Sequence, residues 1–102
     1  MPSSGRQGLT PEKAFAAALR EARKSRGLSQ EQLGFESGYH RTYVGMLERR
    51  LMNPTLRTIL SLSAALKTPA GELVQRVEDL VGSQWRKTEK AEPAARARKA
   101  SR

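Results

Sequence analysis

Two short helices with almost no chain between them constrain the fold more than any other feature of the sequence. Ser29 and Gln32 have the spacing of a capping box, in which each side chain accepts a hydrogen bond from the other residue's backbone N–H. A helix over about residues 30–36 is therefore expected to end at Gly38, and the next, over about residues 41–49, begins two or three residues later. Helices this short, joined by so tight a turn, cannot lie antiparallel and must cross steeply.

Helical patterns flank this pair on both sides, and no segment has the alternation typical of a strand. Thr10 starts a helix over about residues 11–25, because it offers an N-cap hydroxyl before a proline and an acid. Thr55 caps another helix over about residues 56–67, and a last helix covers about residues 70–82. The expected inward stripe of the fourth helix consists of Leu56, Ile59, Leu62 and Leu66. The fold class is therefore all-α, with five helices around a helix-turn-helix.

The chain of 102 residues has 19 basic and 10 acidic residues, a net charge of +9. One domain is expected over residues 10–85, since this length allows one small core. Residues 1–9 are rich in serine and glycine, and residues 86–102 combine seven basic residues with no bulky apolar one, so both ends are expected to be disordered. The positive charge points to a polyanion such as nucleic acid or serves solubility alone, and both readings apply to the basic tail.

Several classes of function lack the residues they need. The chain has no cysteine and one histidine, which excludes disulfides, cysteine-based redox sites and a histidine-rich metal site. No segment has the ~18 apolar residues of a membrane span, and the N-terminus lacks the apolar region of a secretory signal. An enzyme is disfavoured as well, because no glycine-rich phosphate loop or catalytic constellation is evident. We expect no cofactor and no membrane association.

From Phe15 to Val74 the chain resembles the Cro/repressor-type helix-turn-helix family, the xenobiotic-response-element-type regulators of bacteria and phages. The matching segments are LREARKSRGLSQEQL, a glycine at position 38, RTYVGMLERR, NPTLRTILSLSAAL and ELV, in ungapped order. The resemblance implies a compact five-helix, lambda-repressor-like DNA-binding domain with double-stranded DNA as its partner. It also implies a cytoplasmic, nucleoid-associated protein, and no effector domain is evident.

Four positions depart from the family pattern. Gly34 replaces the usual alanine and still lets the next helix approach closely, while Gly45 replaces a frequent serine. His40 is a poorer N-cap than the usual serine or threonine. Arg50 stands where the family usually has glycine, and a left-handed conformation there would cost about 1 kcal/mol.

The resemblance implies that the helix over residues 41–49 lies in the major groove of DNA. The implied base-contacting residues are Arg41, Thr42, Gly45 and Met46. The Arg41 guanidinium can bond the O6 and N7 atoms of guanine, and Gly45 lets the helix backbone come close to the bases. The alternatives are an ion pair of Arg41 with Glu36 or Glu48, and a core-filling role for Met46.

The implied contacts to the DNA backbone are Gln30, His40, Tyr43, Arg49, Arg50 and Asn53. Gln30 stands at a helix N-terminus, where free N–H groups favour phosphate, and it either also braces the recognition helix or is an ordinary polar residue. Tyr43 either flanks the groove or packs its ring against the preceding helix. The resemblance further implies a structural ion pair between Arg23 and Glu48, which fixes the recognition helix to the first helix.

The last helix has a wide apolar stripe for a domain of this size. Leu73 and Val77 are expected to face the core. The remaining apolar residues form the expected dimer interface: Val74, Leu80, Val81 and Trp85. The alternative is that they cover the core of a monomer. A two-fold dimer would present two recognition helices about 34 Å apart, which matches the half-sites of a palindrome.

These observations predict a repressor-like, sequence-specific transcriptional regulator that binds a palindromic operator as a homodimer. A phage-type repressor, a housekeeping regulator and a restriction–modification controller all fit this description. An antitoxin that binds a protein partner and uses its helix-turn-helix for autoregulation is the alternative. The basic, alanine- and proline-containing tail does not favour that alternative, since a mostly apolar or helical tail is expected there.

Overall fold

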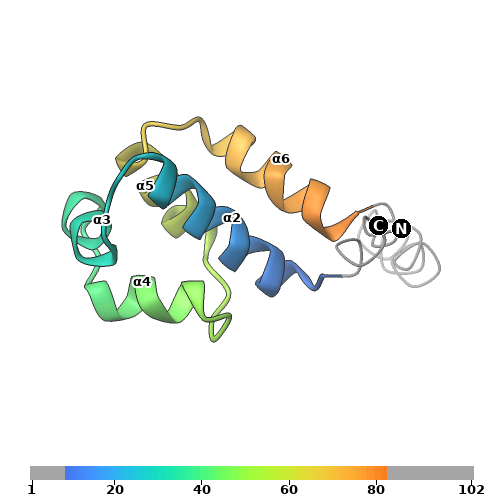
Figure 1. Ribbon diagram of the computed structural model, residues 1–102, viewed down its shortest axis with the longest axis horizontal. Coiled ribbons are helices and arrows are strands. Elements are labelled where there is room, and N and C mark those ends of the chain that lie inside the picture. The colour runs from blue at the N-terminus through green and yellow to red at the C-terminus, as the bar shows by residue number, and fades with distance from the viewer. Residues whose placement is uncertain (1–8, 83–102) are drawn as a thin grey trace, which may run out of the picture.

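The computed structural model describes residues 9–82, and this part of the chain forms five helices and no strand (Figure 1). The helices are α2 (Pro11–Ser25), α3 (Gln30–Ser37), α4 (Arg41–Glu48), α5 (Leu56–Ala65) and α6 (Ala70–Val81). The all-α, five-helix prediction is confirmed, and α3 crosses α4 steeply, as the short turn requires. Trp85 and the two ends predicted to be disordered lie outside the described residues, apart from Leu9.

Side-chain caps start α2, α3 and α5 at the predicted positions. The Thr10 hydroxyl accepts a hydrogen bond from the Lys13 N–H at 3.2 Å, and Thr55 caps α5 in the same way. At α3 the capping box is complete, with distances of 3.0 Å from the Gln32 N–H to the Ser29 hydroxyl and 2.8 Å from the Ser29 N–H to the Gln32 side chain. These caps satisfy backbone N–H groups that have no partner within the helix.

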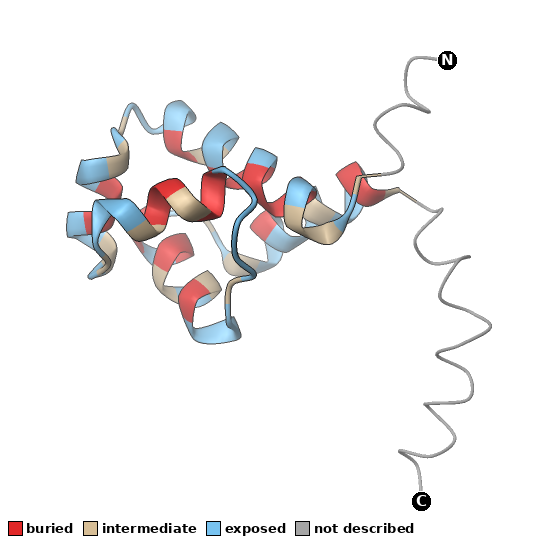
Figure 2. Cartoon of the chain, turned by 90° about the horizontal axis from the view of Figure 1, so that it is seen from below, coloured by how far each residue is buried: buried red, intermediate tan, exposed pale blue. Residues whose placement is uncertain are grey.

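One hydrophobic core joins all five helices. Its centre consists of side chains with almost no exposed surface: Leu19, Leu33, Val44, Leu47, Leu62 and Leu66. Figure 2 shows buried residues on the inner faces of the helices and exposed residues on their outer faces. Val44 and Leu47 are buried on the inner side of α4, which packs mainly against α3 and α2.

The predicted inward stripe of α5 is wrong at its first residue. Leu56 is 71% exposed, and Thr58 takes the inward position in the first turn. The Thr58 hydroxyl accepts a hydrogen bond from the Tyr39 hydroxyl at 3.1 Å, which stabilises a polar group inside the fold. Leu56, two residues earlier and about 200° away around the helix, faces outward.

The prediction for α6 also needs correction. Leu80 and Val81 are each only 6% exposed in the single chain, because α6 packs its length against α2. They belong to the core of the protomer, as Leu73 does, and are not left over for a second copy. Val74 is exposed as predicted.

Candidate nucleic-acid interface

The helix α4 lies along one edge of the molecule with its outer side uncovered (Figure 1). Arg41 and Thr42 are exposed at its start, and Met46 is partly buried one turn later. The arrangement of α3 and α4 requires a glycine at position 34, since a Cβ atom there would lie 2.6 Å from the Tyr39 carbonyl oxygen. The prediction that Gly34 permits a close approach is therefore confirmed.

The predicted ion pair between Arg23 and Glu48 is present and buried. Arg23 donates two hydrogen bonds to the Glu48 carboxylate, from Nε to Oε2 at 2.6 Å and from Nη2 to Oε1 at 2.9 Å. The third nitrogen, Nη1, donates to the Leu28 carbonyl at 2.8 Å, so this guanidinium also fixes the segment between α2 and α3. The pair joins the end of α4 to the end of α2.

Two further side chains complete this link. Gln30 Nε2 donates to Glu48 Oε1 at 3.0 Å, which confirms that Gln30 braces the recognition helix. Arg20 Nη2 donates to the Glu48 backbone carbonyl at 3.2 Å, near the end of α4 where carbonyl groups lack partners. Arg20 was not among the predicted contacts, although its position three residues before Arg23 puts both on one side of α2.

Charge and burial act on Glu48 in opposite directions. Burial alone would raise the pKa of the carboxyl group, but the hydrogen bonds from Arg23 and Gln30 and the charges of Arg23 and Arg20 outweigh it and lower the pKa below its ordinary value of 4.5. The hydrogen bond to Glu48 likewise raises the pKa of Arg23. Both groups are therefore charged at neutral pH, and the pair leaves no uncompensated buried charge.

Gly45 has a different role from the one predicted. It is buried, and a Cβ atom at this position would lie 3.3 Å from Gln30 Oε1 and 3.5 Å from Arg49 Nη1. The side chain of Gln30 therefore lies over Gly45 and separates it from the outer surface. The glycine makes room for the Gln30 brace and does not form an open gap toward the bases.

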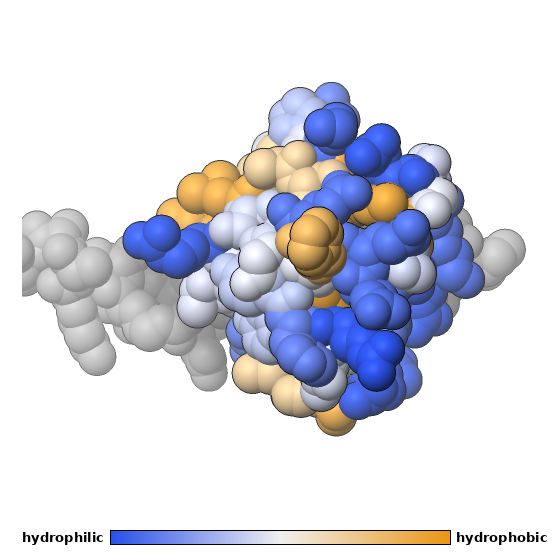
Figure 3. Space-filling view, turned by 90° about the vertical axis from the view of Figure 1, so that its left-hand side faces the viewer, coloured by the Kyte–Doolittle hydropathy of each residue, from blue (hydrophilic) through white to orange (hydrophobic). Residues whose placement is uncertain are grey.

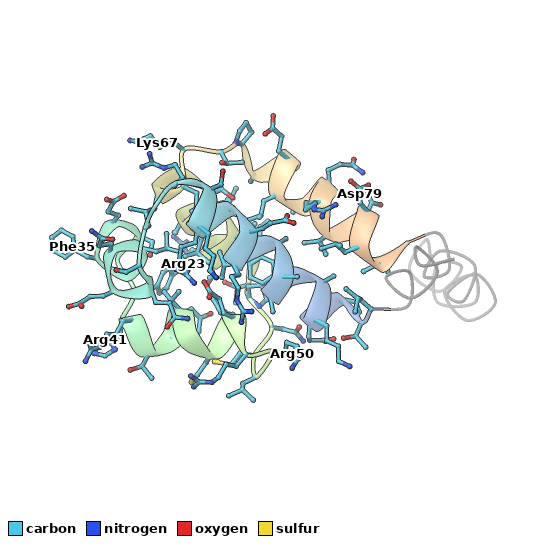
Figure 4. All side chains as sticks on the ribbon, in the orientation of Figure 1. Arg23, Phe35, Arg41, Arg50, Lys67 and Asp79 are labelled. Carbon is cyan, nitrogen blue, oxygen red and sulfur yellow. The ribbon has the colours of Figure 1, made fainter. Side chains whose placement is uncertain are left out.

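Arg41 points away from the body of the molecule (Figure 4) and pairs with neither Glu36 nor Glu48. Its Nη1 atom lies 3.5 Å from Oε1 of Glu31, and both side chains are largely exposed. An exposed pair at this distance contributes little free energy, so Arg41 can leave it for another acceptor. Thr42 is next to it and equally accessible.

Two predicted backbone contacts take part in the internal structure of the interface. His40 is the N-cap of α4, with its Nδ1 atom accepting a hydrogen bond from the Thr42 N–H at 3.0 Å. Tyr43 is partly buried, with its ring centre 5.2 Å from that of Tyr39 and its hydroxyl 3.4 Å from the Thr58 hydroxyl. The Tyr43 ring thus packs against the turn and α5.

The remaining predicted backbone contacts lie beyond the end of α4. Arg49, Arg50 and Asn53 are all exposed. Arg50 has a φ of 66°, the left-handed conformation in which a non-glycine residue is strained.

The side of the molecule that bears α3 is mostly polar (Figure 3). Figure 3 views the side on which α3 lies, which is largely hydrophilic with isolated hydrophobic spots, and Phe35 on α3 is 87% exposed. Among residues 9–82, no three histidine, cysteine or acidic side chains gather closely enough to hold a metal ion. No helix in this range is both long and apolar enough to cross a membrane.

Comparison with known proteins gives a consistent match to this arrangement. A family model described as helix-turn-helix matches residues 19–73. The chain is 45% identical over 62 residues to the control protein C.SmaI of Serratia marcescens, a match that covers 61% of this chain and 74% of that protein. It is similar in structure to the restriction–modification controller protein C.AhdI from Aeromonas hydrophila, with 47% identity, a TM-score of 0.59, and coverage of 61% of this chain and 94% of C.AhdI.

A third similarity shows the fold alone. The restriction–modification controller protein C.Esp1396I, solved as a tetramer in complex with its natural 35 base-pair operator, matches with a TM-score of 0.61 and 22% identity. The match covers 68% of this chain and 96% of that protein.

Proposed function

The chain belongs to the helix-turn-helix family, and from this premise we propose that it is a sequence-specific, DNA-binding transcriptional regulator. In this proposal α4 enters the major groove of a palindromic operator, and the protein binds as a dimer. The observation that carries the proposal is the fixation of α4. A buried ion pair and the Gln30 and Arg20 hydrogen bonds hold its inner side, while Arg41 and Thr42 are exposed on its outer side.

This geometry suits the reading of bases. The helix is already fixed in the free protein. Binding of DNA therefore does not have to order the helix before its side chains reach the base edges. Arg41 gives up only a weak exposed pair, and its planar fork can then bond guanine, which is worth about 1–3 kcal/mol of discrimination. Thr42 offers a hydroxyl and a methyl group beside it, and Met46 can add apolar contact where it is exposed.

Sequence identity with two controller proteins favours a more specific role for this regulator. C.SmaI and C.AhdI share 45% and 47% of their aligned residues with this chain, and the latter is described as a restriction–modification controller. We therefore favour a controller of this kind over a phage-type repressor. Nothing in the described residues favours an antitoxin role. A DNA-binding regulator would work at the nucleoid, in the cytoplasm.

The dimer surface must be reconsidered, since Leu80 and Val81 lie in the core of the protomer. We place it instead on the outer side of α5, where Leu56 and Leu60 are exposed one turn apart. Leu51, in the segment between α4 and α5, is exposed as well, and Val74 remains a candidate on α6.

Selection of bound duplexes from a random pool, with wild-type protein and Arg41→Ala, tests the function. We expect the wild type to enrich one sequence with two symmetric halves. Arg41→Ala should lose preference at one position of each half while keeping salt-sensitive binding, because contacts to phosphate remain. Lys67→Ala, on the far side of the molecule (Figure 4), is the control and should select like the wild type. Equal binding of all sequences by the wild type would contradict the proposal.

A further inference from the structure

A side chain from α3 covers the middle of the outer side of α4. Gly45 follows Arg41 and Thr42 by about one turn, at the spacing that puts all three on one face of the helix. A Cβ atom at position 45 would lie 3.3 Å from Gln30 Oε1, so the Gln30 carboxamide occupies the space into which a side chain of residue 45 would extend. The centre of the reading face is therefore supplied by α3 rather than by α4.

The orientation of this carboxamide follows from its other contact. Gln30 Nε2 donates to Glu48 Oε1 at 3.0 Å, and a carboxylate only accepts hydrogen bonds, so the amide nitrogen must face Glu48. The amide oxygen, on the other branch of the same planar group, lies over Gly45. Within residues 9–82 it accepts no hydrogen bond, and Gln30 is only partly buried. Oε1 is thus a fixed acceptor that is open to a ligand.

The Arg49 guanidinium borders the same space, with Nη1 3.5 Å from the Cβ position of Gly45. No hydrogen bond or ion pair with the described residues holds this exposed side chain in place. The group with a fixed direction at the centre of the reading face is therefore the oxygen of Gln30.

A fixed acceptor in the major groove distinguishes bases by their exocyclic groups. Adenine presents its N6 amine there and cytosine its N4 amine, whereas guanine presents two acceptors, and thymine an acceptor and a methyl group. Guanine or thymine opposite Gln30 Oε1 would leave two acceptors facing each other without a proton between them. The amide cannot turn its nitrogen outward instead, because Glu48 would then lose a hydrogen bond to its buried carboxylate.

We propose that Gln30 determines sequence specificity, with Oε1 accepting a hydrogen bond from the exocyclic amine of adenine or cytosine. The inference rests on the proposed function and replaces the backbone contact that the family resemblance implies for Gln30. Gly45 is about 6 Å from Arg41 along the helix axis, which corresponds to about two base-pair steps. The amine is therefore expected within about two base pairs of the guanine that Arg41 reads.

Operator selection with Gln30→Met tests the inference, because methionine has a similar length and no amide oxygen. Glu48 keeps its hydrogen bonds from Arg23 in this variant, so the fold should persist, which thermal unfolding checks. The wild type should select adenine or cytosine at one position of each half-site. Gln30→Met should accept all four bases there and keep the guanine that Arg41 reads.

Gln75→Met on α6 is the matched control. It also removes an amide that donates to a carboxylate, since Gln75 Nε2 lies 3.0 Å from Asp79 Oδ1. This variant should select the same sequence as the wild type. Loss of the same base preference in Gln75→Met would overturn the inference, because the loss would then not depend on the place of the amide.

Removing the amine from the DNA tests the contact in the wild-type protein, independently of how a variant folds. Purine in place of the selected adenine, or 2-pyrimidinone in place of the selected cytosine, lacks only the exocyclic amine. The change should weaken wild-type binding about fivefold, the effect of one hydrogen bond, and should weaken binding of Gln30→Met much less. Equal losses for the two proteins would assign the amine to another residue and overturn the inference.

Two further outcomes separate the inference from the proposed function. If the wild type selects an operator, while Gln30→Met keeps every base preference and binds all duplexes more weakly by one factor, Gln30 contacts only the DNA backbone or braces α4. The inference is then wrong and the proposed function stands. If the wild type selects no operator, the proposed function fails and the inference fails with it.

Discussion

At the scale of single residues, Glu48 ties the end of α4 to α2 and α3. Its carboxylate accepts hydrogen bonds from two arginine nitrogens and from Gln30, and the backbone carbonyl of the same residue accepts one from Arg20. A buried pair of this kind is not in itself a large source of stability, because both charges lose their hydration. Its effect is positional, since a displaced α4 would leave the carboxylate buried without partners.

Arg23→Ala should therefore cost about 3–5 kcal/mol in the free energy of unfolding, because it strands the Glu48 charge. Arg76→Ala is the matched control. Arg76 makes a similar two-pronged contact with Glu21, at 2.9 and 3.0 Å, but on the surface, where such pairs contribute about 0–1 kcal/mol. Urea unfolding of both variants measures the difference, and equal losses would contradict the account of Glu48.

The stability of the wild type and that of Arg23→Ala should also respond in opposite directions to a fall in pH. In the wild type the folded-state pKa of Glu48 lies below 4.5, so its contribution is complete above that value and is lost as pH falls through the folded-state pKa. Without Arg23, burial dominates and raises the carboxyl pKa. Arg23→Ala should then regain part of its lost stability as pH falls from 7 toward 4.5. A deficit that stays constant over this range would contradict the prediction.

At the scale of elements, the ends of the helices were predictable and the directions of some faces were not. Each N-cap hydroxyl accepts a hydrogen bond from a backbone N–H three residues later in the chain. The caps at Thr10, Ser29 and Thr55 can therefore be predicted from the local sequence alone. The inward face of α5 depends on Thr58, whose polar side chain is satisfied by Tyr39 from another element. Likewise, Gly45 leaves space for the Gln30 side chain only because α3 packs against α4 in this orientation. That orientation cannot be predicted from the sequence of α4 alone.

The N-cap of α4 allows a prediction at this scale. His40→Ala removes the acceptor of the Thr42 N–H and should lower the free energy of unfolding by about 1 kcal/mol. His40→Ser should keep the protein at least as stable as the wild type, because a serine hydroxyl can accept the same hydrogen bond. Amide exchange resolved by residue checks the cause. We expect faster exchange in the first turn of α4 in His40→Ala, and unchanged exchange there would refute the capping role.

At the scale of the whole molecule, the proposed operator binding needs two copies of α4 in a fixed relation. One protomer presents a single α4. Leu80 and Val81 lie in the core of that protomer and are not available for contact with a second copy. In the proposed dimer, the apolar surface that stays exposed on α5 is the one that a second copy covers. Burying a leucine side chain contributes about 1.5–3 kcal/mol, so two copies of Leu56 and Leu60 can supply much of a dimer's stability.

Leu56→Glu combined with Leu60→Glu should therefore convert a dimer into a folded monomer. Both positions are exposed, at 71% and 53%, so the charges disturb an association surface and not the core. Sedimentation equilibrium should show the monomer mass, and operator binding should weaken because a single α4 reads a single half-site. Phe35→Glu, at an exposed aromatic residue on α3, is the control and should keep the dimer mass. A dimer that survives the double substitution but dissociates with Val74→Glu would move the interface to α6.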